Sequence, residues 1–183
     1  MKTPKPKTCK ECNNKFIPLR PLQSVCDYKC AHERTRKREQ KRVEWARVQQ
    51  RKQDVEKLMT LTDWLNVAQK VVNTYVRLRD ADLPCVSCNA TQAKWSAGHF
   101  HSQGGHSFLR FHEDNLHKQC VRCNLELHSN PHEYRERLTL KIGAGRVEYL
   151  DKHRNAPRKY SIDEVKELIT EYRMKIKQLK TTI

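Results

Sequence analysis

The stretch that decides the fold runs from Cys85 to Asn130 and reads CVSCNATQAKWSAGHFHSQGGHSFLRFHEDNLHKQCVRCNLELHSN. It holds two Cys-x2-Cys pairs, Cys85/Cys88 and Cys120/Cys123, and 31 residues separate the pairs. Four thiolates form the closed, tetrahedral donor set of a structural zinc. Histidines and amides crowd the same stretch, and such donors suit a second, harder cation. The sequence therefore predicts two metals of different kinds in one small region.

The composition points to a small core and an anionic partner. Only 37% of the 183 residues are hydrophobic, below the usual 45–50% or so. We therefore expect the fold to need further stabilisation, such as bound metal ions. The formal net charge is +16. An excess of this size favours a nucleic acid or an anionic membrane surface as partner, the plain alternative being a merely soluble basic protein.

A membrane role is not expected. The start, MKTPKPKTCK, has positive charge without an apolar run behind it, so it does not resemble a secretory signal. No stretch approaches the roughly 18 apolar residues of a spanning helix. A cytoplasmic location follows by elimination, and in that reducing compartment the eight cysteines are expected to bind metal instead of forming disulfides.

Residues 1–30 form a second cysteine module. Its four thiols follow the spacing C-x2-C-x13-C-x3-C, which predicts another tetrahedral zinc site, at Cys9, Cys12, Cys26 and Cys30. A module this small cannot fold on apolar burial alone, so the metal is expected to supply much of its folding free energy. It could be a finger that contacts DNA or a cap that positions the next helix, and both interpretations stay open.

Residues 31–58 are predicted to form a long exposed helix. Gly and Pro are absent, and the apolar residues are too sparse for a face that packs on a core. Its first half is strongly basic. We favour an arm that contacts phosphates over a solvated connector, with the contacts made by Arg34, Arg36, Lys37, Arg38, Lys41 and Arg42.

Two amphipathic helices are predicted on either side of the central stretch. The first spans 60–80 with a capping box at Thr60 and Asp63, and the last opens at Ser161 with Glu164. Between them, a helix beginning at Asn130-Pro131 is expected to end at the glycines 143 and 145. This division gives a core at 60–142 and a C-terminal helical region at 143–183, which serves as a core or dimer element.

Within the central stretch, 91–112 is predicted to be a β-hairpin and a helix is expected from about Val121. His99 then lies near the end of the first strand and Asn115 lies after the second. Asn124 and His128 are four residues apart and would share one helix face. An imidazole, an orienting amide and metal ligands are the groups that phosphodiester hydrolysis needs.

The residues AGHFHSQGG and LRFHEDNLHKQCVRCN resemble the HNH, or ββα-metal, nucleases, and in particular the phage lambda NinG (Rap) family. The resemblance covers most of the chain. It implies a mainly α protein with a small zinc-stabilised, treble-clef-like ββα-metal nuclease core, encoded by a phage or prophage and acting in the host cytoplasm. The implied activity is cleavage of branched DNA, such as D-loops and Holliday junctions, in recombination, with phage or host recombination proteins as further partners.

The resemblance also implies roles for individual residues. His99 would be the general base and Asn115 would hold the imidazole or its loop. In the similar endonuclease VII resolvases, the asparagine after the last cysteine ligates magnesium, and Asn124 occupies that position here. Asn124 would therefore bind Mg²⁺ or Mn²⁺, with His128 as a second ligand. One position departs from the family pattern, because many HNH enzymes have an acidic ligand where this chain has Gly98. The substitute ligand stays open among His99 itself, His101, Asp114, Glu126 and His128.

Two other functions remain in competition. Cysteine modules and basic arms would equally serve a non-catalytic, zinc-finger DNA-binding or architectural protein. An HNH enzyme that reads a base sequence is the other alternative, although no base-reading helix is evident and phosphate contacts carry no sequence information. Resolving a four-way junction requires cuts in opposed strands, so a homodimer is also expected.

Overall fold

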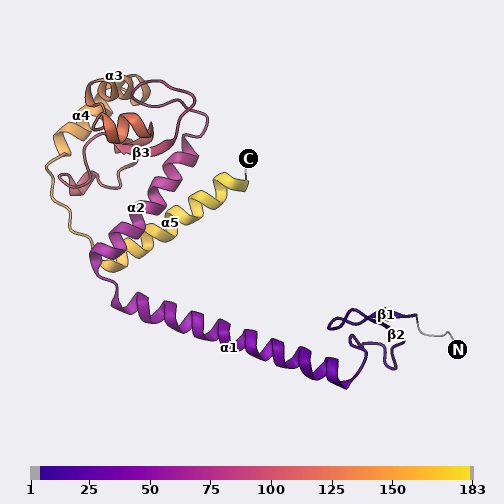
Figure 1. Ribbon diagram of the computed structural model, residues 1–183. Coiled ribbons are helices and arrows are strands. Elements are labelled where there is room, and N and C mark those ends of the chain that lie inside the picture. Colours follow the sequence, from indigo (N-terminus) through magenta and orange to yellow (C-terminus); the bar gives the residue numbers. More distant parts are fainter. Residues whose placement is uncertain (1–4, 182–183) are drawn as a thin grey trace. The chain divides into compact units, whose positions relative to one another are not determined.

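In a computed structural model, which describes residues 5–181, the chain divides into two compact units, Met1–Leu58 and Met59–Ile183 (Figure 1). Helices make up 59% of the chain, which confirms the mainly α class. The finer division into four segments remains a prediction. Its outermost parts, residues 1–4 and 182–183, lie outside the described residues. No helix in the described part of the chain is long and apolar enough to cross a membrane.

The first unit consists of a small cysteine module and one long helix. Two short antiparallel strands, β1 (Lys7–Thr8) and β2 (Lys15–Phe16), precede helix α1 (Tyr28–Leu58). The predicted long helix is present and begins three residues early, because the Asp27 carboxylate accepts a hydrogen bond from the Cys30 N–H at 2.8 Å. None of its residues is buried, as its sparse apolar pattern predicts.

The second unit is built on two helices that lie side by side, α2 (Leu61–Arg79) and α5 (Ile162–Thr181) (Figure 1). Both predicted caps are present: Thr60 and Asp63 form the capping box, and Ser161 exchanges hydrogen bonds with Glu164. Residues from both helices and from the sheet beneath them share one apolar core, which includes Ala68, Val72, Val76, Ala97, Leu116, Val165, Ile169 and Tyr172. The last helix is therefore a core element of this unit.

A second apolar core lies under helices α3 (Pro131–Ile142) and α4 (Ala144–His153) and contains Val86, Leu109, Tyr134, Leu138, Val147 and Leu150. Helix α3 has Pro131 at its start, as predicted, but the expected Asn130 cap is wrong: Asn130 is left-handed, with φ 45°, and its side chain makes no cap bond. Only Gly143, with φ 86°, ends the helix. Gly145 lies inside α4, a helix that the sequence patterns did not predict.

The sheet between these cores differs from the predicted hairpin. Strand β3 (Trp95–His99) is present, but its antiparallel partner is β4 (Leu116–Cys120), with Gly98 opposite His117. The predicted second strand, residues 107–112, contains the short 3-10 turn η1 (Ser107–Leu109) instead. The physical reason is that Leu109 and Phe111 are buried in different cores, which a straight strand in this position would not allow.

The helix expected from Val121 is also wrong beyond its first turn. A single turn, η3 (Arg122–Glu126), begins inside the second cysteine pair and contains Cys123. The backbone then enters the left-handed region at three successive residues, His128, Ser129 and Asn130. Asn124 and His128 consequently do not project from one regular helix face. Such backbone is costly for residues other than glycine, and hydrogen bonds to the Ser129 carbonyl help to hold it.

Asp80, at the end of α2, joins the helix pair to the sheet. It is 3% exposed, and its carboxylate accepts two hydrogen bonds from Arg79 at 3.0 Å and one from the Lys118 N–H at 3.0 Å. Burial alone would raise the pKa of Asp80, but Arg79, the Lys118 N–H and Lys141 together outweigh it and hold the pKa below the ordinary 3.8. The carboxylate thus stabilises the fold in its charged form.

Replacing Asp80 by asparagine is expected to lower the free energy of unfolding by about 3–5 kcal/mol, because half-buried Arg79 loses the nearer of its two acidic partners and keeps Glu113 at 3.7 Å. Urea titration measures the loss, and Asp82→Asn, two residues further along the chain and exposed, is the matched control. Because the folded pKa is depressed, the stabilisation is present above about pH 4 and is lost as the pH falls further. Equal stability of the two variants would contradict this role.

Candidate metal centres and catalytic site

The four cysteines of the N-terminal module converge as the spacing predicts. The sulfur atoms of Cys9, Cys12, Cys26 and Cys30 all lie within 4.8 Å of one another. The Cys12–Cys26 and Cys26–Cys30 sulfurs are 3.6 and 3.5 Å apart. Tetrahedral zinc with bonds of about 2.3 Å requires sulfurs about 3.8 Å apart, so the cluster could hold a zinc ion.

The central cysteines form a second cluster of the same kind, Cys85, Cys88, Cys120 and Cys123. Burial would raise the pKa of Cys85, but backbone N–H donors, including that of Cys120 at 3.3 Å, lower it to about 7. Burial and the neighbouring sulfurs raise the pKa of Cys123 strongly. Four thiolates at this distance need a cation between them, so this cluster also fits zinc. A zinc ion in this cluster would link the end of the second strand, at Cys120, to the loop that precedes the first strand, at Cys85 and Cys88.

His99 occupies the last position of β3 and points toward helix α2. Its Nε2 lies 3.2 Å from the Arg110 carbonyl oxygen and 3.5 Å from the Gln69 amide nitrogen. Burial lowers the pKa of His99, so the imidazole is neutral near pH 7. A carbonyl oxygen only accepts hydrogen bonds, so the neutral ring carries its proton on Nε2 and its lone pair on Nδ1. No protein group within residues 5–181 bonds to Nδ1.

Asn115 is fully buried and holds the loop that follows His99. Its Oδ1 accepts from the His101 N–H at 2.7 Å, and its Nδ2 donates to the carbonyls of His101 at 2.9 Å and Leu109 at 3.0 Å. Of the two roles expected for Asn115, the geometry fits the second, because the amide holds the loop and has no bond to the His99 ring.

The groups considered as substitutes for the missing acidic ligand are mostly engaged elsewhere. His101 Nε2 lies 2.9 Å from Asp151, and Asp114 is paired with Arg146. Glu126 and His128 are exposed on and after η3, and Asn124 on that turn is half-buried. Within residues 5–181, the two cysteine clusters are the only groups of three or more His, Cys, Asp or Glu side chains close enough to hold a metal. The Mg²⁺ or Mn²⁺ site therefore remains a prediction.

The space at Gly98 is filled by Gln119 of the neighbouring strand. A β-carbon at position 98 would lie 2.0 Å from Gln119 Oε1. Gln119 is fully buried and its Nε2 donates to Ser87 Oγ and to the Ser129 carbonyl, both at 2.7 Å. Glycine is thus required for close approach, and an acidic ligand cannot be accommodated at this position without moving Gln119.

We expect Gly98→Asp to lower the free energy of unfolding by about 1–3 kcal/mol through overpacking. Gly104→Asp, where nothing lies within 4 Å of the added β-carbon, is the control. Adding Gln119→Ala to Gly98→Asp should make the double loss smaller than the sum of the single losses, since the clash disappears. Thermal unfolding of the four variants measures this coupling, and a strictly additive result would contradict the close approach.

Sequence reasoning missed one charged group beside this site. Asp151 accepts from both Arg135 Nη atoms at 2.8 and 2.9 Å and bonds His101, which ties α4 to α3 and to the loop after β3. It was missed because α4 itself was not predicted. His117, another histidine of the stretch, is buried against Tyr134, and burial lowers its pKa to about 3, so it is a core residue.

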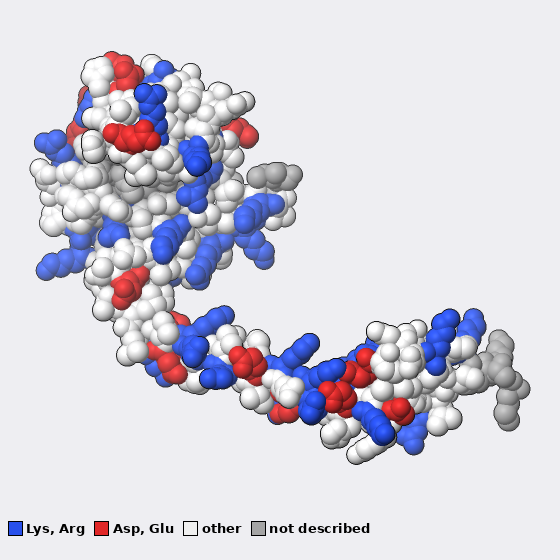
Figure 2. Space-filling model, in the orientation of Figure 1, with Lys and Arg blue, Asp and Glu red and all other residues white. Residues whose placement is uncertain are grey.

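A basic hollow lies in the first unit, where the cysteine module meets the start of α1. It is lined by Lys10, Glu11, Asn13, Arg34, Lys37, Arg38 and Lys41. Three of the six predicted phosphate-contacting residues have an acidic partner: Arg36 bonds Glu33, Arg42 bonds Glu39 and Lys37 bonds Glu11. Figure 2 shows acidic side chains among the basic ones along α1. Arg34, Arg38 and Lys41 are the strongest candidates for an anion.

Comparison with known proteins gives a consistent family match. The model of the family described as Bacteriophage Lambda NinG protein matches residues 1–182. Protein ninG of Escherichia phage lambda is 41% identical over 120 residues, and Protein ninG of Salmonella phage P22 is 40% identical over 118. These matches cover 65% and 64% of this chain and 58% of each relative, so the chain spans less than three fifths of the relatives' length. No solved structure matches the chain significantly.

Proposed function

Because the chain belongs to the NinG family of phage proteins, we propose that it is a metal-dependent endonuclease that cuts branched DNA during phage recombination. It would act in the cytoplasm of the bacterial host, alongside phage or host recombination proteins. The proposal places the chain in the HNH, or ββα-metal, superfamily. The order of its parts supports this: a zinc-type cysteine pair, a strand ending in His99, a second strand, and the other pair leading into a short helical turn.

The state of His99 is the observation that carries the proposal. The Arg110 carbonyl holds the proton on Nε2, so the lone pair on Nδ1 is available to accept a proton from water. A neutral imidazole is suited to general-base work near pH 7. Asn115 supports this arrangement indirectly, because it fixes the loop next to the base.

The proposed catalytic cation is Mg²⁺ or Mn²⁺, and Asn124 and His128 would hold it. Such a cation would neutralise the charge that develops on the scissile phosphate. Carboxamide oxygens suit hard cations, and the left-handed residues after η3 place His128 in an exposed position. The four thiolates of the central cluster would keep their zinc structural.

Contacts to DNA are proposed for the basic start of α1. Residues Arg34, Arg38 and Lys41 line the basic hollow with Lys37 and Lys10, and the net charge of +16 favours a polyanion. A symmetric homodimer would place two active sites for opposed cuts. Sedimentation at working concentration tests that point, since a monomer alone would remove it.

Cleavage of matched DNA substrates tests the proposed function against its two alternatives. A four-way junction, a D-loop and a linear duplex of the same sequence are incubated with the zinc-loaded protein and Mg²⁺. We expect cuts in the branched substrates and little cutting of the duplex. Equal cutting of the duplex at one sequence would favour a sequence-reading HNH enzyme, and binding without cuts would favour an architectural protein.

A further inference from the structure

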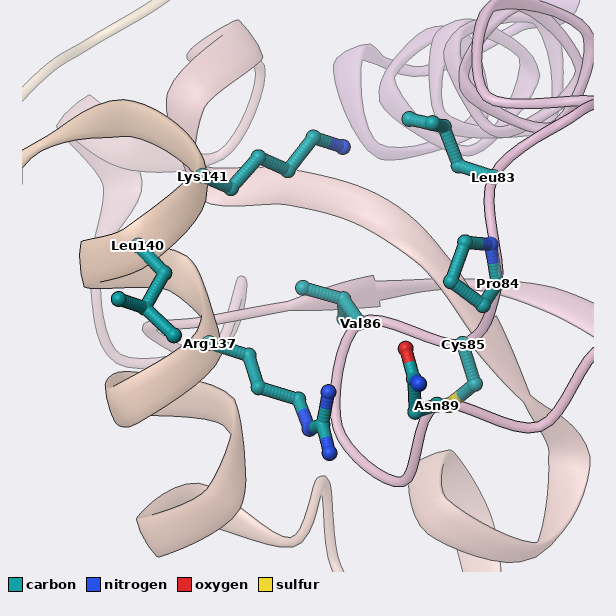
Figure 3. Close-up of a pocket in the computed structure, with 8 residues that line it drawn as sticks. All are labelled: Leu83, Pro84, Cys85, Val86, Asn89, Arg137, Leu140 and Lys141. Atoms are coloured by element: carbon teal, nitrogen blue, oxygen red, sulfur yellow. The ribbon is translucent and has the colours of Figure 1, made fainter.

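A pocket of about 290 Å³ lies between helix α3 and the loop that enters the first central cysteine pair. Figure 3 shows its two sides, with the loop residues opposite those of α3. Apolar side chains contribute walls from both sides. Figure 3 shows the Arg137 guanidinium on the side of Asn89 and the Lys141 amine at the opposite end of the pocket. The residues that matter here are Leu83, Val86 and Leu140 for the walls and Asn89, Arg137 and Lys141 for the polar groups.

The charge around the pocket is unbalanced. Arg137 Nε is buried and has no hydrogen-bond partner among the described residues, a costly state for a charged group in the absence of an anion. Lys141 lies 3.3 Å from Asp80, a carboxylate that also accepts two hydrogen bonds from Arg79. Arg137 is therefore the cation of this pocket that a bound anion would complete, since Lys141 already has Asp80 as its partner.

We propose that this pocket binds one unpaired nucleotide of branched DNA, with Arg137 on its phosphate and the apolar walls against its base. The proposal rests on the proposed function. A pocket of about 290 Å³ is at the small end for ligands, a size suited to one nucleotide and not to a duplex. A base that has left the stack can pack against apolar side chains, and Asn89 adds an amide for the base edge.

Such a pocket would explain how the protein could prefer branched DNA to linear duplex without a helix that reads the bases. Nucleotides at branch points can leave the stack at little cost, whereas those of a regular duplex cannot. Phosphate contacts alone position DNA but do not distinguish branched from linear forms. The pocket supplies that distinction and is separate from His99, which faces α2.

The test compares binding to two duplexes of identical sequence, one with a single extra unpaired thymidine. Binding is measured by fluorescence anisotropy with the zinc-loaded full chain and Ca²⁺ in place of Mg²⁺. The wild-type protein should prefer the bulged duplex. Arg137→Gln should reduce this preference about tenfold, as loss of a charge-assisted contact predicts, with a change of less than about twofold for the linear duplex. Lys152→Gln, an exposed lysine of α4, is the control for charge.

A second variant guards against loss of folding. Leu140 is 87% exposed, so Leu140→Ser should fold normally and still weaken the preference. Replacing the unpaired thymidine with an abasic residue should remove the Leu140 effect and keep that of Arg137. An unchanged preference in both variants, or an equal loss on both duplexes, would overturn the pocket while junction cleavage by wild type still upheld the endonuclease. A wild-type protein that binds the bulged and the linear duplex equally well would also overturn the pocket, and junction cleavage would still decide the proposed function separately.

Discussion

Replacing His99 by alanine is expected to lower the single-turnover rate of junction cleavage by about 10²–10⁴-fold, the usual contribution of a positioned general base. The imidazole would accept the proton of the attacking water through Nδ1, because Nε2 is committed to the Arg110 carbonyl. Since burial lowers the pKa of His99, the wild-type rate should rise with pH through a pKa below 6.5 and then level off. At lower pH the ring is protonated and cannot act as the base.

Three controls make the His99 experiment decisive. His132→Ala removes an exposed histidine of α3 and should cleave at the wild-type rate. Thermal unfolding and zinc content of His99→Ala should match those of wild type. Added imidazole should restore part of the rate of His99→Ala, because the variant leaves room for a free base. A folded His99→Ala protein that cuts at the wild-type rate would eliminate the catalytic assignment.

Loss of the central zinc is expected to unfold the second unit. Structural zinc bound by cysteines contributes on the order of 10 kcal/mol, which is comparable to the whole stability of a typical domain. Cys120→Ser should therefore abolish the cooperative unfolding transition of the second unit, and the bound metal should fall from two ions per chain, one for each cluster, to one. Calorimetry and metal analysis on the same samples measure both effects.

The N-terminal cluster provides the matched comparison. Cys26→Ser should also remove one zinc, but the transition of the second unit should persist, since Cys26 belongs to the other compact unit. A Cys120→Ser protein that unfolds like wild type would show that the central cluster does not hold the fold together. Both variants are measured in the full-length protein, so the experiment does not require either unit to fold as an isolated fragment.

Local patterns in the sequence were sufficient to predict helices α1, α2, α3 and α5 and the two cysteine clusters, but not α4. Cysteine spacing directly indicates which thiols can bind one metal ion. The Thr60 and Ser161 caps lie next to clear apolar periodicity, so both predicted helix starts were correct. The long α1 was predicted from helix-forming residues without a core face. These features depend on neighbours in the chain, which a single sequence displays.

The sheet was not predictable in the same way. Strand β4, LHKQC, is buried at every position, yet three of its five residues are polar and the alternation of a strand is absent. Distant groups satisfy them: Asp80 accepts from the Lys118 N–H, and Gln119 bonds Ser87. The filling of Gly98 by Gln119 depends on the same pairing register, so the substitute for an acidic ligand could not be resolved from sequence.

The metal dependence of cutting tests the central claim most directly. One four-way junction, labelled at its 5′ ends, is incubated with the zinc-loaded protein under Mg²⁺, under Mn²⁺ and without either cation, and products are resolved on a denaturing gel. We predict nicks that carry 5′-phosphates and 3′-hydroxyls only when Mg²⁺ or Mn²⁺ is present. A junction that is bound but stays intact with both cations would contradict the endonuclease and identify the chain as a DNA-binding protein without catalysis.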